Sequence, residues 1–237
     1  MTSILRTGGA ARLGALLLLA GPLVSWAAEL VTAAAWTNPR YAPLYNWVSH
    51  LGLPEREIAF GQAADSPLAW VMNTGWVFHG VVLIAGAALL LDQRKGWRPI
   101  ALTVLAVLSG VGVSLVGLVH GSNENVANGL AVFHFLGAQT VIVSGNVFAL
   151  LAGLSAGRLG LGRSPGRTLV VLGVLGLIGY ILFMVDVRAG IEWNIGLFER
   201  WAIYPIMIGH ALLGAVTLTR QPATVLDKRE AGAVLTG

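Results

Sequence analysis

The chain has 237 residues, of which 56% are apolar and 11% are charged, and its formal net charge is +4. This leaves too little polar surface to coat a globule in water, so the composition excludes an ordinary soluble domain. The absence of cysteine also excludes a disulfide framework and thiolate chemistry.

Six apolar runs are long enough to cross about 30 Å of hydrocarbon, for which a helix needs about 20 residues. They cover residues 13–36, 68–91, 99–120, 130–154, 168–187 and 201–219. Because the runs lack the alternating polarity of barrel strands, we expect helices. The sequence therefore predicts an all-α fold: a polytopic transmembrane bundle of six spanning helices, forming a single integral membrane domain over residues 1–237.

Basic residues gather in every second gap between these runs. One set of segments contains eleven of the fifteen: Arg6, Arg12, Arg94, Lys95, Arg98, Arg158, Arg163, Arg167, Arg220, Lys228 and Arg229. The other set contains Arg40, Arg56, Arg188 and Arg200. Lys and Arg are enriched in cytoplasmic loops, so this pattern predicts a multi-pass protein of the cell membrane with both termini in the cytoplasm. The positive charge indicates contact with anionic lipid headgroups and gives no support to nucleic-acid binding.

The first apolar run has two interpretations. Arg6 and Arg12 followed by LGALLLLAGPLVSWAA resemble a secretory signal, with Ser25 and Ala27 at the small positions before a cut. The apolar character continues as far as Trp36, however, which is typical of a spanning helix. Cleavage would leave five helices.

The longest segment outside the runs, residues 37–67, is rich in aromatic residues. Aromatic rings favour the headgroup level of a bilayer, so we expect this segment to lie along the outer interface and to fold back over the helices.

Several short sequence features occur in a characteristic order along the chain. They are Tyr41, Pro43, Val48, Ser49, Leu51, Gly52, Asn73, Gly75, Gly110, Gly112, Gly117, His134 and the GLFERWAIYP stretch from Gly196 to Pro205. In this set the chain resembles a family of prokaryotic membrane proteins catalogued as domain of unknown function number 998, over most of residues 37–215. The resemblance implies a bundle of about six helices and implies no activity. Where that family commonly has an acid between the serine and Leu-Gly, this chain has His50.

Glycines are frequent in two of the predicted helices. They are Gly110, Gly112 and Gly117 in 99–120, and Gly173, Gly176 and Gly179 in 168–187. Small residues allow neighbouring backbones to approach closely. We therefore expect these two helices to be the buried, central ones.

Two histidines, His79 and His210, lie near the middle of their helices, roughly 14 Å from the outer boundary. Polar groups at this depth normally face the bundle interior and are functional candidates. Imidazoles there could carry protons in a small transporter, or simply bond a neighbouring helix.

A second group of polar residues is expected near the outer face. The candidates for catalysis are His50, His120, His134, Asp65, Asp186 and Glu199. Such residue types serve in general acid–base chemistry and as ligands of Zn²⁺. No HExxH motif or other diagnostic spacing is present, and no cofactor is evident beyond this alternative of Zn²⁺.

We interpret the protein from its sequence as one that binds a lipid or another amphiphile in an outer-face cleft. The candidate ligand-binding residues are Tyr41, Trp47, Ser49, Asn73, His134 and Arg200. Two alternatives remain: a membrane-embedded hydrolase or transferase, metal-dependent or not, that acts on a lipid headgroup, and a proton-coupled transporter. Membrane lipids are the expected partners, and the sequence does not decide whether the chain forms a homo-oligomer.

Overall fold

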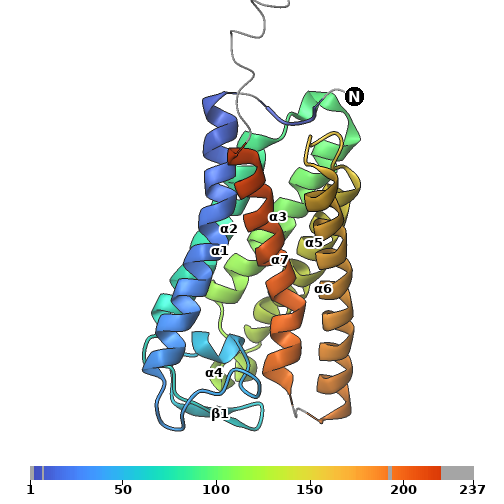
Figure 1. Cartoon of the computed structure of the whole chain (residues 1–237). Coiled ribbons are helices and arrows are strands. Elements are labelled where there is room, and N and C mark those ends of the chain that lie inside the picture. Colours follow the sequence, from blue (N-terminus) through green and yellow to red (C-terminus); the bar gives the residue numbers. More distant parts are fainter. Residues whose placement is uncertain (1–2, 7, 192–193, 220–237) are drawn as a thin grey trace, which may run out of the picture.

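The structure, a computed structural model, describes residues 3–6, 8–191 and 194–219. Within them the protein is mostly helical, with six helices that are long and apolar enough to cross a membrane (Figure 1). These are α1 (Gly9–Ala35), α2 (Ala69–Leu90), α3 (Trp97–Leu118), α5 (Ala131–Leu154), α6 (Arg163–Ala189) and α7 (Ile195–Leu218). The predicted helical class and the six candidate spans are confirmed. The largest difference is at α7, which begins at Ile195 instead of at residue 201.

The helices form a closed ring in which each packs on its two neighbours. Following the contacts around the ring gives the order α1, α2, α3, α5, α6, α7, with α7 returning to α1. The middle of the ring is therefore lined by all six helices, and no helix occupies a central position. Helix α1 is a full member of the ring because it packs on both α2 and α7.

Glycines set the close approaches between neighbours. A Cβ atom added at Gly112 of α3 would lie 2.7 Å from the carbonyl oxygen of Gly137 on α5. One added at Gly173 of α6 would lie 2.7 Å from the carbonyl oxygen of Asn146. Both helix pairs can therefore pack this closely only without side chains at these positions.

The expectation that α3 and α6 are the buried, central helices is wrong, because α3 is no more buried than its neighbours and α6 is the least buried of the six. Only 22% of its apolar window is buried, against 44% to 50% for the other five helices. Gly173, Gly176 and Gly179 form one buried stripe that contacts α5 and α7, and besides them only Gly166, Leu169 and Asp186 of α6 are buried. A stripe of small residues shows how closely one face is approached, and does not show how many faces are covered.

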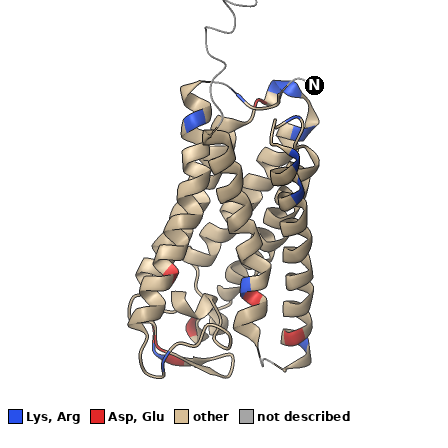
Figure 2. Ribbon diagram, viewed as in Figure 1, with Lys and Arg blue, Asp and Glu red and all other residues tan. Residues whose placement is uncertain are grey.

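Most of the described basic residues lie at one end of the bundle, and most of the acidic residues lie at the other (Figure 2). The basic end holds the start of α1, the α2–α3 and α5–α6 connections and residues 3–6; its described basic residues are Arg6, Arg12, Arg94, Lys95, Arg98, Arg158, Arg163 and Arg167. The acidic end holds residues 36–68, 119–130, 190–191 and 194. Arg220, Lys228 and Arg229, which also entered the orientation argument, lie outside the described residues. The sidedness of the protein in its membrane stays a prediction.

The basic half of the ring is filled with apolar side chains. Its core consists of Ile4, Leu5, Ala11, Leu18, Leu83, Ala87, Leu90, Leu91, Leu102, Ala106, Phe148, Ala152, Leu159, Leu161, Leu169 and Leu213. The segment before α1 closes this end, since Ile4 donates its N–H to the Arg158 carbonyl and Arg6 donates to that of Leu90. Every long helix contributes to this core, so the six are locked together here.

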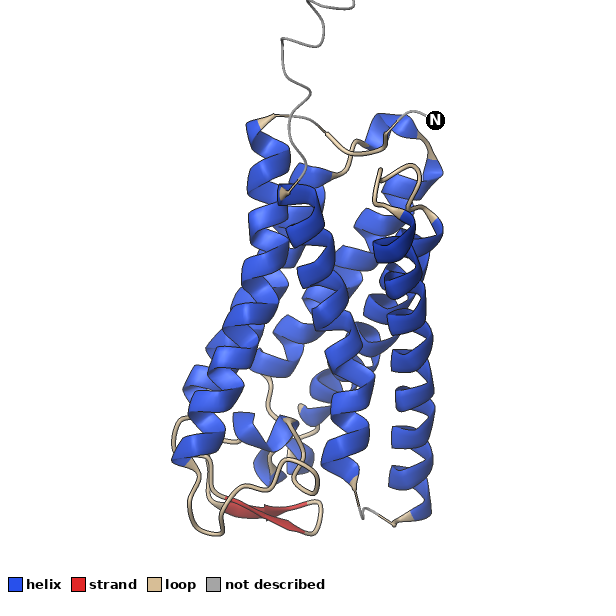
Figure 3. Ribbon diagram, in the orientation of Figure 1, coloured by secondary structure: helices blue, strands red, loops and turns tan. Residues whose placement is uncertain are grey.

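The acidic end carries most of the remaining secondary structure (Figure 3), while the 3-10 helix η2 (Gln93–Lys95) lies in the α2–α3 connection at the basic end. A short 3-10 helix, η1 (Ser49–Gly52), is followed by a hairpin of β1 (Glu57–Ala59) and β2 (Gln62–Ala64), and α4 (Asn123–Ala127) precedes α5. The two residues of the hairpin turn, Phe60 and Gly61, have φ angles of 46° and 76°. Positive values at both positions match the twist of paired strands, but they are rare for a residue as bulky as phenylalanine. The turn holds the Phe60 ring against the mouth of the bundle.

Candidate functional site

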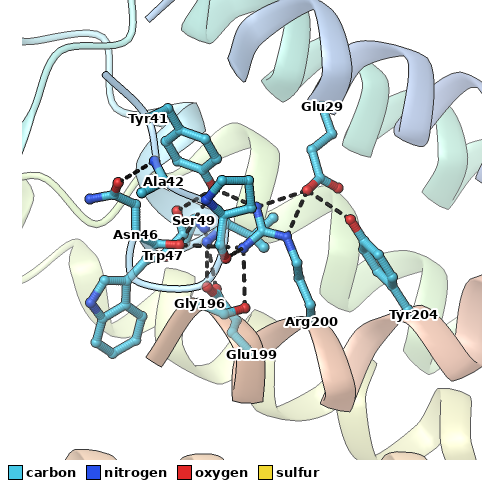
Figure 4. Close-up of polar contacts among 12 residues, drawn as sticks. Glu29, Tyr41, Ala42, Asn46, Trp47, Ser49, Gly196, Glu199, Arg200 and Tyr204 are labelled. Atoms are coloured by element: carbon cyan, nitrogen blue, oxygen red, sulfur yellow. Dashed lines mark hydrogen bonds and ion pairs between the residues drawn. The ribbon is translucent and has the colours of Figure 1, made fainter. Parts of the chain in front are cut away.

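A buried ion pair joins the first and last helices at the acidic end (Figure 4). Arg200 of α7 donates from Nε to Glu29 Oε1 of α1 over 3.0 Å, and its Nη2 lies 2.9 Å from the same oxygen. The Tyr204 hydroxyl donates to this oxygen as well, over 2.9 Å. The two charged side chains are only 10% and 9% exposed. Each charge is therefore compensated where water is scarce.

The other donors of Arg200 hold the segment between α1 and α2. Its Nη2 donates to the Tyr41 hydroxyl over 2.6 Å, and its Nη1 donates to the carbonyl groups of Pro43, Asn46 and Gly196. The Tyr41 hydroxyl in turn donates to the Trp47 carbonyl over 3.1 Å. Desolvation raises the pKa of Tyr41 above its ordinary range, against the opposing charge of Arg200, so the phenol stays protonated. Residues 41–47 are thus fastened to α7.

Glu199 adds a second attachment. Its Oε2 accepts from the Val48 N–H over 2.5 Å and its Oε1 accepts from the Ser49 N–H over 3.2 Å. These two N–H groups belong to the start of η1, where no helical carbonyl is available to accept them. The adjacent residues Glu199 and Arg200 of α7 therefore hold residues 41–49 against the acidic end of the ring.

A central cavity lies inside the ring. Its volume is about 90 Å³, and all six long helices contribute to its wall. The lining is mainly aliphatic, with Val113, Ile142, Ile203 and Met207 among its members. The polar groups in the wall are Ser25, Ser49, His79, Ser109, His134, Glu199 and His210.

A lateral cavity of about 290 Å³ adjoins it, between the halves of α5 and α6 nearer the acidic end, and Trp47, Ser49 and His50 also line it. Its wall is rich in aromatic residues: Trp47, Phe60, Phe135, Tyr180 and Phe183. Six residues line both cavities, namely Ser49, His134, Ala138, Ile142, Phe183 and Glu199. The lateral cavity reaches the outer surface of the ring, because Phe135 and Gln139 line it and are also exposed.

Four buried histidines line the two cavities: His50, His134, His79 and His210. His50 is 1% exposed and stacks on both Trp47 and Phe60, with ring centroids at 5.8 Å and 6.2 Å, and these two rings also contact each other at 5.8 Å. Desolvation, with a smaller effect of His134, lowers the pKa of His50 to about 4, so its ring is neutral at physiological pH. His134 is held by a 2.8 Å hydrogen bond from its Nδ1 to the Val119 carbonyl.

The deepest imidazoles are paired. His79 of α2 and His210 of α7 lie with their ring centroids 5.8 Å apart and their planes at 90°. His79 Nδ1 is 3.1 Å from the Ser25 hydroxyl. His79 Nε2 and both ring nitrogens of His210 are buried and have no partner within the described residues.

The sequence-predicted candidates are only partly brought together. Of the six proposed for catalysis, His50, His134 and Glu199 line the lateral cavity. Asp65 instead lies 3.6 Å from Arg56 in an exposed ion pair, and His120 contacts the Asn125 side chain over 3.3 Å. Asp186 is buried with one carboxylate oxygen unpartnered, away from both cavity walls. In the described part of the chain, no three His, Asp or Glu side chains form a group that could hold a metal ion.

The six candidates for ligand binding divide in a similar way. Trp47, Ser49 and His134 line one or both cavities. Tyr41 and Arg200 belong to the attachment of the segment, and neither lines a cavity wall. Asn73 donates to the Gly52 carbonyl over 2.9 Å and so holds the end of η1.

Several cavity residues carry no signal in the sequence. Phe60 enters the site through the hairpin turn, and Phe183 is one apolar residue among many in α6. Ser25 and Ser109 sit at ordinary positions of apolar helices. Only the pairing of Ser25 with His79, across two helices, distinguishes it from a packing residue.

Taken with the charge separation, six apolar helices around a common interior define a multi-pass membrane protein. The family described as protein of unknown function DUF998 matches residues 19–216, from within α1 to the last turn of α7. The chain therefore belongs to this family. Neither a search of curated proteins nor one of solved structures gave a match.

Proposed function

We propose that this protein binds a single amphiphilic molecule of the membrane within the connected central and lateral cavities. The observation that carries the proposal is the shared wall: His134, Ala138, Ile142 and Phe183 border both spaces. An elongated molecule can therefore occupy both. Ligand sites are typically concave and mostly apolar, with a few convergent polar groups, and these cavities have that character.

The position of the lateral cavity supports entry from the lipid. Two of its lining residues on α5, Phe135 and Gln139, are exposed at the surface of the ring. At the basic end α5 and α6 are in close contact, since a Cβ added at Gly153 would lie 2.6 Å from the Gly166 carbonyl oxygen. The gap between them is thus restricted to the acidic half.

The fastened segment supplies the roof of the site. Trp47, His50 and Phe60 line the lateral cavity on the side of the acidic end. The contacts of Glu199 and Arg200 hold the segment that contains Trp47 and His50. A rigid roof keeps the cavity formed before the ligand arrives, which reduces the ordering cost of binding.

The two alternatives have less support. A metal-dependent hydrolase or transferase needs several ligands around one ion, and the described His and carboxylate groups do not gather in this way. A proton-coupled transporter needs a polar route to both ends. Here the interior of the helix bundle between His210 and the basic end is filled by apolar side chains. One of them, Phe148, contacts His210, with side-chain ring centroids 5.3 Å apart.

The proposal is tested by native mass spectrometry of the protein extracted from its membrane in mild detergent. We expect an amphiphile to remain bound to the wild type and to be lost in Ala138→Phe, because the added ring would fill the junction of the two cavities. Val132→Phe is the matched control, since Val132 lies on the same helix, is 48% exposed and lines neither cavity. Equal retention by Ala138→Phe and wild type would refute the proposal, as would a wild type that carries no amphiphile.

A further inference from the structure

The wall of the central cavity contains buried polar atoms that have no hydrogen-bond partner in the described chain. His79 Nε2, both ring nitrogens of His210 and the Ser109 hydroxyl are buried without a partner in the described chain. These side chains are 5%, 1% and 0% exposed, and all three line the central cavity. Leaving buried polar groups unpaired is costly, so a cluster of them around one space indicates a missing polar partner.

The hydrogen bonds of the neighbours define what that partner must offer. The Ser25 hydroxyl has one proton to donate and lies 3.4 Å from the Gly75 carbonyl oxygen and 3.1 Å from His79 Nδ1. If the proton goes to Gly75, His79 Nδ1 carries the ring N–H and Nε2 needs a donor; if it goes to Nδ1, Nε2 carries the N–H and needs an acceptor. His134 Nδ1 donates to the Val119 carbonyl, which leaves its Nε2 as an acceptor.

His210 needs a donor and an acceptor together. Neither nitrogen of its ring has a partner, and a neutral imidazole has one N–H and one lone pair. A hydroxyl group can both donate and accept. One hydroxyl at the His79–His210 pair can therefore accept from the N–H of one ring and donate to the lone pair of the other, whichever tautomer His79 adopts.

Charge at the site excludes an ionic head. Within the described residues no Lys or Arg side chain lines either cavity, and Arg200 is neutralised by Glu29 and occupied by backbone carbonyls. The Glu199 oxygens accept from two backbone N–H groups. A charged head would have to be buried near the bilayer midplane without compensation, at a large cost.

We propose, building on the function above, that the ligand is an uncharged lipid alcohol whose hydroxyl group binds between His79 and His210. Its hydrocarbon chain runs past Ile142 and Phe183 through the lateral cavity and leaves the ring between α5 and α6. Phe148 beneath His210 ends the cavity on the side of the basic half. The deep end of the site thus recognises the hydroxyl, and the lateral end accommodates the chain.

The test measures saturable binding of tritiated hexadecanol to the purified full-length protein in detergent, with competition by unlabelled methyl hexadecyl ether and hexadecanoate. The ether keeps the chain and one acceptor but cannot donate, and hexadecanoate keeps the chain but is charged. We expect wild-type protein to prefer hexadecanol to either competitor by about tenfold, since a site built around a hydroxyl rejects analogues that lack its donor.

His79→Leu is expected to remove this preference while leaving hydrocarbon binding in place. Phe78→Leu is the matched control, because Phe78 is the preceding residue of α2, is 39% exposed and lines neither cavity. Should His79→Leu fail to fold, Ser109→Ala provides the second variant, with a loss of preference of about threefold.

The outcomes separate the two proposals. Equal affinity of the wild type for hexadecanol and its ether would overturn the hydroxyl site, meaning that only water meets the histidines, and would leave amphiphile binding intact. An unchanged preference in both His79→Leu and Ser109→Ala would also overturn it. If no probe binds saturably, or if Ala138→Phe binds hexadecanol as the wild type does, amphiphile binding itself fails.

Discussion

The two halves of the ring are made by the same six helices but are filled in different ways. In the basic half, sixteen buried apolar residues form one continuous core that also includes the segment before α1. In the acidic half the helices surround two cavities, a buried ion pair and four imidazoles. The contrast indicates that the basic half holds the bundle together, while the acidic half contains the space that the proposed binding requires.

The difference also explains where polar groups are tolerated. In the acidic half, Glu29, Glu199 and Arg200 are buried, but each has partners that compensate its desolvation. Other buried polar atoms have no partner in the described chain, among them those of His50 and Asp186, but the unpaired atoms of His79, His210 and Ser109 share the wall of the central cavity. A group of such atoms around one cavity is the feature expected of a binding site rather than of a packed core.

The largest effect is expected when the ion pair of the acidic half is broken. Arg200→Met leaves the Glu29 carboxylate buried without compensation and frees the segment at residues 41–47, so the free energy of unfolding should fall by about 3–5 kcal/mol. Denaturant unfolding in detergent micelles measures it.

The control for this change is Arg56→Met. Arg56 pairs with Asp65 over 3.6 Å, but its side chain is 68% exposed, so its loss should cost less than about 1 kcal/mol. Similar losses for the two variants would mean that burial of the Arg200 pair contributes nothing to the acidic half.

A second prediction compares equal deletions in the two halves. Leu102 is fully buried in the basic core, while Ile142 is buried but borders both cavities. Leu102→Ala should cost about 3 kcal/mol because it opens a new void, and Ile142→Ala about half as much because part of its surface already faces empty space. Thermal unfolding of both variants, without added amphiphile, provides the measurement. A larger loss for Ile142→Ala would contradict the assignment of the stabilising core to the basic half.

A third prediction concerns pH. The pKa of His50 is lowered to about 4 from an ordinary value of 6.5, so between these values the unfolded chain binds a proton that the folded chain does not. Stability is therefore unaffected by His50 above about pH 6.5 and falls as the pH is lowered towards 4. Between pH 6.5 and pH 5 the loss attributable to His50 should be roughly 2 kcal/mol.

The measurement for this prediction is the pH dependence of unfolding for the wild type and for His50→Leu. Subtracting the two removes the contribution of the other histidines. Parallel curves for the two proteins would show that His50 is already charged, or still solvated, in the folded state.

The sequence predicted the parts of this structure that depend on local composition. The apolar runs correspond to the six long helices, and the basic gaps correspond to one end of the bundle. Their lengths and charges are set by the bilayer and require no knowledge of which helix meets which. The same reasoning selected His50, His134 and Glu199, which share a cavity, but it also selected Asp65 and His120, which do not.

The rest depends on contacts between distant parts of the chain. Glu29 and Arg200 meet although 171 positions separate them, and nothing near either residue specifies its partner. Phe60 reaches the cavity through a left-handed turn that a phenylalanine rarely adopts, so no local pattern indicates it. Helix α6 does not have the central position expected for it, because close helix packing on one face does not require burial of the other faces.

The smallest effect should come from the contact that holds the cavity wall together. A Cβ at Gly112 would meet the Gly137 carbonyl oxygen and the Val141 nitrogen at 2.7 Å, both backbone atoms that cannot rotate away. Gly112→Ala should therefore push α3 and α5 apart and cost about 1–2 kcal/mol. Gly209→Ala is the control, because its Cβ would meet Ala149 and Leu169 side chains at 3.5 Å and 3.6 Å, which are ordinary contact distances. There the alanine should be neutral or slightly stabilising, since it also favours the helix. Thermal unfolding distinguishes the two variants, and an equal loss in both would show that general helix packing, and not the close α3–α5 contact, determines the stability of the cavity wall.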